Sequence, residues 1–417
     1  MSKKADFQDR HTGRPKILFV GEIHSTHAQT WIETLRGEQF DIRALALTTD
    51  DVPKSFPYPF DAPRRRIPRP ALRAGATILE RAVSRWKQVR STSLYFYDRI
   101  AFGDQATAHL FKRIVRTWQP DIIHCLGLLA AGRFVVESLR GEDLRKNSKL
   151  VIQLRGGSDL ALNHADAELA PKLADALRDA DEILSDNVVN FELMRRMGLT
   201  VQPPAGLERV PGTGGIDLGL PVFNNLKPAS QRRIILWPKA YESPWSKGMP
   251  VLEALKLAWE RMLPFHLHMV MAVNELPSWI ALLPEEMRQH ITMHRHIPRD
   301  RLFELMREAR IMLAPSLIDG TPNVMWESMA AGAVPLVSPL DTITPLVKDG
   351  ENVVMARNLY PQEIADALVR AMTDDALVDR IATTNRRVVS GLAGREIFRP
   401  KILDFYRSVA ASNRICS

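Results

Sequence analysis

Cysteine is scarce in this sequence of 417 residues. Its two cysteines, Cys125 and Cys416, offer no disulfide framework, which fits a reducing cytoplasm best. Long apolar runs are also absent, since stretches such as LHMVMAV are far too short to span a bilayer. The N-terminus is polar and has no apolar core, so it does not predict a signal peptide. Any membrane contact is therefore expected to be peripheral.

Two common ligand-binding patterns are missing as well. The first predicted strand, KILFVG, is not followed by G-x-G-x-x-G, which argues against an NAD-binding opening. His290, His294 and His296 lie close in sequence, but no carboxylate or cysteine joins them, and no other cluster has metal-ligand spacing. Asp179 and Asp181 form a D-x-D, but they precede a strand instead of following one. We therefore predict no metal and no cofactor.

Strand and helix patterns alternate along the chain and predict an α/β protein. At this length, two domains are the natural expectation. The strand KILFVG is followed by an amphipathic helix and by the strand FDIRALALT, an order that implies parallel strands with right-handed crossovers. A second series starts at the strand RIILWP, after glycines at 212–215 that are typical of a hinge. Such sheets bind ligands at the carboxyl ends of their strands.

The stretch Ile311–Gly332 predicts a strand, a loop and a helix. IMLAPS has the length of a buried strand, and VPLVS follows the stretch as the next strand. Thr321 and Pro322 predict the helix start, with the threonine hydroxyl as N-cap and the proline at the first helical position. Gly332 predicts the end of the helix.

The predicted helix start offers a polar site. The first N–H groups, at Asn323 and Val324, and the positive end of the helix dipole suit a phosphate. Glu327 leans back toward this end, because helical side chains tilt toward the N-terminus. A carboxylate so placed can accept hydrogen bonds from both hydroxyls of a ribose. Asp319 lies in the preceding loop, but the spacing of two acids is weak evidence without its context.

That context, DGTPNVMWESMAAGAVPLVSP, closely resembles the Glu-x7-Glu motif of retaining nucleotide-sugar glycosyltransferases of the GT-B fold, family four. Asp319 takes the place of the first acid and Glu327 that of the second. The resemblance implies an α/β fold of two Rossmann-like, doubly wound domains that face each other across a cleft. It also implies retaining, metal-independent transfer of a sugar from a UDP-sugar or GDP-sugar to a glycan or lipid-linked acceptor.

The resemblance implies donor-side roles for several residues. Glu327 would hold the ribose, and Asp319, one methylene shorter than the usual glutamate, would hold sugar hydroxyls. Backbone groups near His296 and Ile297 would hold the nucleobase. The other donor-binding residues are expected at Gly21, Gly320, Thr321, Asn323 and Val324.

Two lysines and a histidine complete the expected catalytic group. Lys239 and Lys247 follow the strand RIILWP, where the family has an arginine and a Lys-Gly pair. Paired cations there would stabilise the diphosphate as the sugar leaves, although two solvated surface lysines are the alternative. His124, in the strand DIIHCLG, matches the family's PDiiHxH strand, with Leu126 in place of the second histidine. His124 is assigned to the catalytic group, with a structural histidine as the alternative.

The acceptor side is expected in the N-terminal half. His27, with a tryptophan four residues on, resembles the family's pattern after the first strand. Between residues 61 and 90, nine basic and two acidic residues give a net +7 of the chain's +8. The run Arg64–Arg66 and a basic amphipathic helix with Trp86 predict contact with an anionic membrane or acceptor. Arg64, Arg65, Arg66 and Trp86 are the residues assigned. An ordinary surface helix is the alternative, and no nucleic-acid module accompanies the charge.

The predicted divisions follow from these matches. They are a disordered tail 1–15, an acceptor domain 16–212, a hinge 213–225, a nucleotide-sugar-binding domain 226–395 and a helix 396–417 that crosses back. We expect a cytoplasmic enzyme of bacterial surface polysaccharide biosynthesis, peripheral on the inner face of the membrane. The departures at Asp319, Lys239 and Leu126 leave open a catalytically weakened scaffold subunit. A nucleotide-sugar epimerase of the same fold is the other alternative.

Overall fold

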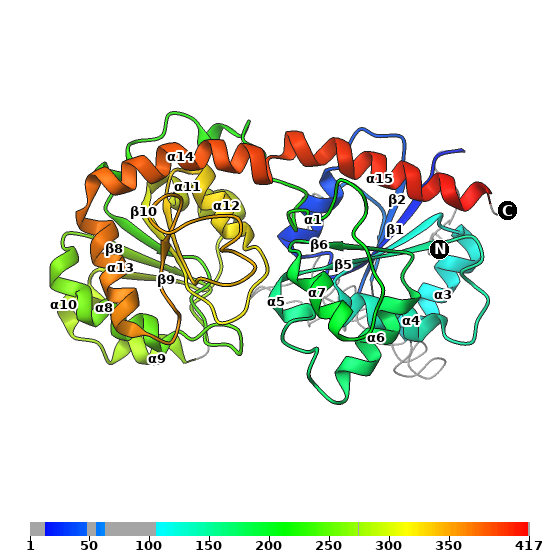
Figure 1. Ribbon diagram of the computed structural model, residues 1–417, viewed down its shortest axis with the longest axis horizontal. Coiled ribbons are helices and arrows are strands. Elements are labelled where there is room, and N and C mark those ends of the chain that lie inside the picture. Colours follow the sequence, from blue (N-terminus) through cyan, green and yellow to red (C-terminus); the bar gives the residue numbers. More distant parts are fainter. Residues whose placement is uncertain (1–12, 48–55, 63–105, 274, 416–417) are drawn as a thin grey trace, which may run out of the picture. The chain divides into compact units, whose positions relative to one another are not determined.

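The computed structural model describes residues 13–47, 56–62, 106–273 and 275–415. The chain forms two compact units (Figure 1). Unit 1 contains residues 1–153, 175–182 and 406–417, and unit 2 contains residues 154–174 and 183–405. Segments 154–174 and 183–212, which the sequence assigned to the N-terminal domain, thus lie in unit 2. Most of the predicted tail 1–15 and the predicted basic helix near Trp86 lie outside the described residues.

The first sheet has six strands in the order β3-β2-β1-β4-β5-β6. The strand pairs from β3 to β5 are parallel. From β1 the chain moves outward to β2 and β3, and from β4 it moves the other way, so β1 and β4 form a topological switch point. The strands are β1 (Lys16–Gly21), β2 (Asp41–Ala46), β3 (Phe60–Asp61), β4 (Ile122–Leu126), β5 (Lys149–Leu154) and β6 (Glu182–Ser185).

Helices connect these strands, as the alternating pattern predicted. Ser25 caps the first helix by accepting a hydrogen bond from the Ala28 N–H at 3.2 Å. The helix α3 ends at Trp118, two residues before Pro120, because the residue before a proline disfavours the helical conformation. The helices are α1 (Thr26–Glu33), α3 (Ala106–Trp118), α4 (Arg133–Leu139), α5 (Gly156–Asp159), α6 (Leu169–Asp179) and α7 (Val189–Arg196), with a π-helical turn η2 (Leu128–Gly132).

The C-terminal helix α15 (Arg395–Ile415) begins in unit 2 and ends in unit 1. Tyr406 anchors its second half in the core of unit 1. The Trp31 indole N–H donates to the Tyr406 hydroxyl at 2.9 Å, and His124 Nδ1 lies 2.5 Å from the same oxygen. Phe19 packs edge-on against the Tyr406 ring. Aromatic packing and a shared hydroxyl therefore fix the end of the chain in this unit.

The second sheet repeats the arrangement in the order β12-β11-β10-β7-β8-β9. All neighbouring pairs in it are parallel. Here β7 and β10 are the neighbours from which the chain moves in opposite directions, so their carboxyl ends form the switch point. The strands are β7 (Ile234–Trp237), β8 (His266–Val270), β9 (Ile291–His294), β10 (Ala309–Ala314), β11 (Val334–Val337) and β12 (Val354–Met355).

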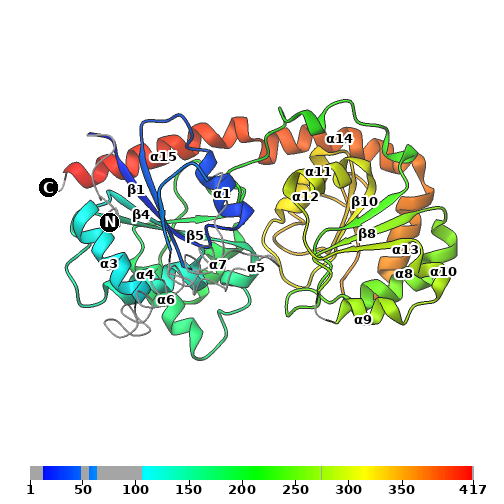
Figure 2. The ribbon, with the colours of Figure 1, turned by 180° about the vertical axis from the view of Figure 1, so that it is seen from behind.

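Helices cover both faces of this sheet (Figures 1 and 2). One apolar core includes side chains of α8 and α13, and the other includes those of α11 and α12. All eight residues of α12 are buried, since this helix lies between the sheet and α14. The helices are α8 (Met249–Met262), α9 (Leu276–Ala281), α10 (Glu285–Arg288), α11 (Arg299–Glu308), α12 (Asn323–Ala330), α13 (Pro361–Thr373) and α14 (Asp375–Ala393), with short turns η3 (Pro221–Phe223) and η4 (Ala229–Gln231).

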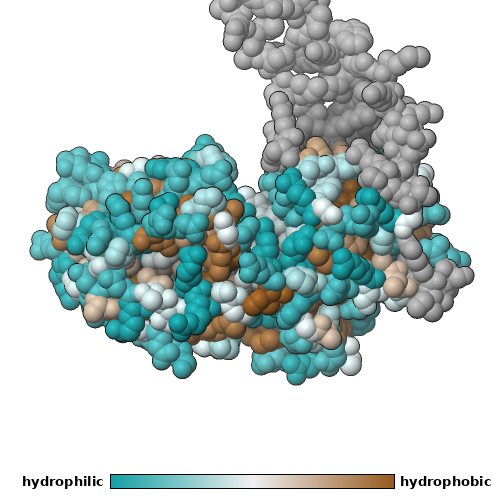
Figure 3. All heavy atoms as spheres, turned by 90° about the horizontal axis from the view of Figure 1, so that it is seen from above, coloured by the Kyte–Doolittle hydropathy of each residue, from teal (hydrophilic) through white to brown (hydrophobic). Residues whose placement is uncertain are grey.

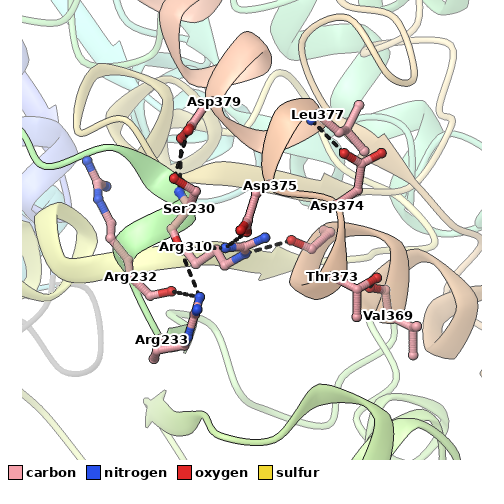
Figure 4. Close-up of polar contacts among 11 residues, drawn as sticks. Ser230, Arg232, Arg233, Arg310, Val369, Thr373, Asp374, Asp375, Leu377 and Asp379 are labelled. Atoms are coloured by element: carbon pink, nitrogen blue, oxygen red, sulfur yellow. Dashed lines mark hydrogen bonds and ion pairs between the residues drawn. The ribbon is translucent and has the colours of Figure 1, made fainter.

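A buried arginine ties the start of β10 to the surrounding helices (Figure 4). The side chain of Arg310 is fully buried. Its Nε donates to the Ala371 carbonyl at 2.8 Å, which satisfies an oxygen in the last turn of α13. Its Nη1 donates to the Ser230 carbonyl at 2.9 Å and pairs with the Asp375 carboxylate at 2.7 Å. One side chain thus links β10, η4, α13 and α14.

The described surface is largely hydrophilic in the view of Figure 3, with apolar residues in scattered patches. In the part of the chain that the structure describes, no helix is long and apolar enough to cross a membrane.

Candidate functional site

The switch point of the second sheet brings the predicted loops together. Lys239 follows β7, and Asp319 follows β10, the neighbouring strand. Because the carboxyl ends of parallel strands meet at one edge of a sheet, both loops reach the same place. The backbone N–H of Leu317 donates to the Trp245 carbonyl at 2.8 Å, which joins the two loops directly.

The loop after β10 is braced on several sides. The Ser246 hydroxyl donates to the Pro315 carbonyl at 3.0 Å. The Thr342 hydroxyl, from the loop after β11, donates to the Asp319 carbonyl at 3.0 Å. The Gly320 N–H turns back onto Asp319 Oδ1 at 2.8 Å. The Asp319 carboxylate is therefore held on a fixed backbone.

The start of α12 differs in detail from the prediction. Pro322 occupies the N-cap position, and no side chain caps the helix. The Thr321 hydroxyl instead donates to the Asp186 carbonyl at 2.9 Å, so the prediction of Thr321 as N-cap is wrong. The hydroxyl thus forms its hydrogen bond with a residue distant in sequence and does not cap the helix. The predicted end is confirmed, because Gly332 follows the helix at φ +73.

Glu327 lies within α12 and is only 7% exposed. Its Oε1 accepts a hydrogen bond from Arg299 Nη2 at 2.9 Å. Burial raises the pKa of Glu327, while the charges of Arg299 and Lys239 lower it. Arg299 was missed by the sequence interpretation. The available signal was a basic residue directly after Pro298, a residue type that often begins a helix, at a position where the helix dipole disfavours a positive charge.

Lys239 lies among carboxylates at this site. Burial alone would lower its pKa, but the charges of Asp319, Glu327 and Asp186 outweigh it, so the pKa of Lys239 is raised. The ammonium therefore stays protonated at neutral pH. A fixed positive charge at this position can stabilise an anionic group bound beside it.

Lys247 is placed by the same loop. Its Nζ pairs with the Glu242 carboxylate at 2.8 Å, and its backbone N–H donates to Asn358 Oδ1 at 2.9 Å. The Glu242 carboxylate also accepts from the Gly248 N–H at 2.8 Å. Lys247 thus shares its charge with Glu242 at the start of α8.

A glycine loop after β5 packs against the loop of Asp319. A Cβ on Gly157 would lie 2.9 Å from the Asp319 backbone nitrogen, closer than real Cβ atoms come. A Cβ on Gly320 would lie 2.3 Å from Asp186 Oδ2. Glycine is required at both positions because the loops approach so closely. The approach brings Asp186, which the sequence interpretation passed over, beside Asp319.

Asp186 is a buried carboxylate. Its Oδ1 accepts from Asn187 Nδ2 at 2.7 Å. Burial raises the pKa of Asp186 to about 7, the Asn187 hydrogen bond opposes the rise, and the charge of Asp319 adds to it. A proton is therefore bound and released here near neutral pH, which distinguishes Asp186 from an ordinary carboxylate.

Asp186→Asn should stabilise the protein more at pH 8 than at pH 5. The pKa is higher in the folded state than in the unfolded state, so the stability that this group contributes is lost as pH rises through about 7. Asparagine keeps the shape and carries no charge at either pH. Calorimetric melting temperatures of wild type and variant at the two pH values measure the effect.

Asp366, which is exposed on α13, provides the matched control. Asp366→Asn should change the melting temperature by the same small amount at pH 5 and at pH 8. An equal shift for Asp186→Asn at the two pH values would contradict the prediction.

The residues predicted from the first sheet lie in unit 1. Gly21 ends β1, where a Cβ would lie 3.0 Å from the Leu126 carbonyl of β4, so glycine permits the close approach of the two strands. His27 is half-buried in the first turn of α1. His124 is fully buried, with its ring against Phe19 and Trp31. These surroundings are those of a core histidine, the structural alternative, and an active-site role for His124 stays a prediction.

The predicted nucleobase loop follows β9. His296 is exposed and Ile297 is half-buried, directly before α11. His294 at the end of β9 bonds to His268 of β8, with 3.0 Å between the ring nitrogens. Among the described residues, no group of three or more histidine, cysteine or acidic side chains could hold a metal. Arg64, Arg65, Arg66 and Trp86 lie outside the described residues.

Comparison with known families finds a match within the second half of the chain. Residues 232–374 match the family model described as "Glycosyl transferases group 1". None of the curated proteins matches the chain at a significant level.

Solved structures resemble the chain over nearly its whole length. Sucrose-phosphate synthase from Thermosynechococcus elongatus is 16% identical at a TM-score of 0.67, covering 96% of this chain and 100% of that one. Anabaena HepE in complex with UDP and glucose is 15% identical at a TM-score of 0.66, covering 95% of this chain and 100% of that one. The α,α-trehalose 6-phosphate synthase from Burkholderia multivorans is 14% identical at a TM-score of 0.63, covering 96% of this chain and 98% of that one. At these identities the likeness shows the fold, GT-B, as predicted.

Proposed function

We propose that this chain, with a Glycosyl transferases group 1 domain at residues 232–374 and the GT-B fold, is a glycosyltransferase that retains the anomeric configuration and needs no bound metal. Its donor is a UDP-sugar or GDP-sugar, in line with the UDP and glucose bound to HepE. The observation that carries the proposal is the convergence of Lys239, Asp319 and the start of α12 at one switch point.

The site supplies what sugar transfer requires. The reaction passes through an oxocarbenium-like state as the diphosphate leaves, so stabilisation of new negative charge is the main need. Lys239 stays protonated at this site. The first N–H groups of α12 lie at the positive end of the helix dipole, which favours a bound anion. Lys247 adds a second cation, shared with Glu242. Asp319 binds sugar hydroxyls, and Glu327 binds the ribose.

The acceptor is a glycan or lipid-linked hydroxyl, and the pathway is bacterial surface polysaccharide synthesis. The support is the charge of residues 61–90, which carry nine basic and two acidic side chains. Such a segment attracts the anionic cytoplasmic face of a membrane. The enzyme on this proposal works in the cytoplasm, peripheral on that face.

Donor binding tests the proposal. A panel of UDP-sugars and GDP-sugars, with EDTA present, should contain at least one compound that raises the melting temperature of the wild type, because a ligand of the folded state stabilises it. Glu327→Ala should weaken that donor about tenfold or more, since a charge-assisted hydrogen bond is lost.

Glu304→Ala is the matched control, because Glu304 lies exposed on α11 and forms an ion pair with Arg301 on the same helix. It should bind the donor as the wild type does. Wild-type affinity in Glu327→Ala would remove the ribose assignment. Transfer activity that EDTA abolishes and manganese restores would remove the metal-independent mechanism.

A further inference from the structure

Arg299 reaches into the donor site from a helix where its charge is unfavourable. It is the first residue of α11, directly after the N-cap Pro298. Cations at a helix N-terminus oppose the helix dipole and destabilise the helix. Helix stability therefore does not account for a basic residue here. Asp300, the next residue, has the sign that the dipole favours.

The guanidinium of Arg299 is held in place from two sides. It lies over the Phe303 ring, 4.8 Å from the centroid, and Phe303 packs against Phe223 in the core. Its Nη2 donates to Glu327 Oε1 at 2.9 Å. A cation over an aromatic face is attracted to it, so Phe303 limits the positions that the guanidinium adopts. The carboxylate of Glu327 is thereby fixed through one of its two oxygens.

We propose that Arg299 is a positioning residue for Glu327, which fixes one carboxylate oxygen and leaves the other to accept from the ribose hydroxyls of the donor. This inference rests on the proposed function, since it assigns Glu327 to the ribose. Arg299 touches the carboxylate and acts on the ligand through it.

The electrostatics of Glu327 fit this role. Burial raises its pKa, and the charged groups that lower it are Arg299, from α11, and Lys239, from the loop after β7. Without Arg299, one of the two opposing charges is lost and the carboxyl binds a proton at higher pH. A protonated carboxyl accepts less strongly from a hydroxyl than a carboxylate does. Ribose recognition would then fail on mild acidification.

The test compares UDP and GDP with their 2′-deoxy counterparts by calorimetric titration between pH 6 and pH 8.5. Wild type should prefer the ribonucleotide about tenfold or more, because a site built to bond a hydroxyl rejects the analogue that lacks it. In Arg299→Gln the preference should fall to about threefold or less. Arg299→Lys should give an intermediate preference, since it keeps the charge and loses the planar guanidinium.

Acidification supplies a second readout. Ribonucleotide affinity of Arg299→Gln should decline at a higher pH than that of wild type, whereas a bridge that only joins two helices would change no pH profile. Arg301→Gln is the matched control, because Arg301 lies two residues along α11 and forms an exposed pair with Glu304. It should behave as wild type in both readouts.

The outcomes separate this inference from the function on which it rests. Suppose that both Arg299 variants prefer the ribonucleotide over its 2′-deoxy counterpart as strongly as the wild type does, with the same pH dependence of affinity. This result would overturn the inference and leave the ribose role of Glu327 intact. A wild type with equal affinity for ribonucleotide and 2′-deoxyribonucleotide would overturn the ribose role, and the inference with it. Arg299→Lys decides the matter if Arg299→Gln does not fold.

Discussion

Lys239→Ala should lower kcat about 100-fold, the effect typical of losing one preorganised group that stabilises developing charge. The carboxylates of Asp319 and Glu327 keep the pKa of Lys239 raised against its burial, so its positive charge persists over the pH range of an assay. The leaving diphosphate gains negative charge as the sugar bond breaks. A cation that meets it there acts on the transition state more than on the bound donor, and KM should change less than kcat.

Two further variants sharpen this prediction. Lys239→Arg keeps the charge and should recover part of the lost rate. Lys256→Ala, which removes an exposed lysine of α8 paired with Glu253, should leave kcat unchanged. Steady-state kinetics with the donor found by the binding screen measure all three. A kcat for Lys239→Ala within about threefold of wild type would contradict the electrostatic role.

Arg310→Ala should lower the free energy of unfolding by about 3 kcal/mol or more. Truncation of a large, fully buried side chain to alanine typically costs about 3–5 kcal/mol, whereas the Asp375 carboxylate is 63% exposed and stays solvated without its partner. The Ala371 carbonyl would lose the hydrogen bond from Arg310, the Ser230 carbonyl would keep only the one from Arg233, and a cavity would replace the fully buried side chain. Denaturant unfolding followed by circular dichroism measures the change.

Arg233 provides a control within the same network (Figure 4). Its guanidinium also donates to the Ser230 carbonyl, at 2.9 Å, but the residue is exposed. Arg233→Ala should therefore cost no more than about 0.5 kcal/mol. Equal losses in the two variants would show that burial of Arg310 does not matter.

The strand, loop and helix at 311–332 could be predicted from the sequence, because the residues that indicate them are close together in the chain. Apolar runs gave the strand that is β10, and Gly332 marked the end of α12 correctly. The helix was expected at 322–331 and spans Asn323–Ala330. Strand and helix periodicity also implied both parallel sheets. Their order, with β7 beside β10 and β1 beside β4, explains why residues from separate loops meet.

The remaining residues escaped prediction because their partners are far away in the chain. Thr321 looked like an N-cap, but its hydroxyl bonds to Asp186, which lies 135 positions away in the sequence. Asp186 itself follows β6, and nothing near it in the sequence indicates a raised pKa. Arg299 likewise meets Glu327 across two helices. Packing between loops and between helices decides such contacts, and periodicity contains no information about them.

The complete burial of α12 has a consequence for protein engineering. With sheet and helices around it and all eight of its residues buried, this helix has no exposed side chain that can be exchanged without disturbing the core. Libraries aimed at new donors should keep α12 and the two lysines after β7 constant and diversify the loop after β9, where half-exposed side chains such as Ile297 offer room. The fold thereby separates a constant part of the enzyme from a part that selection can alter.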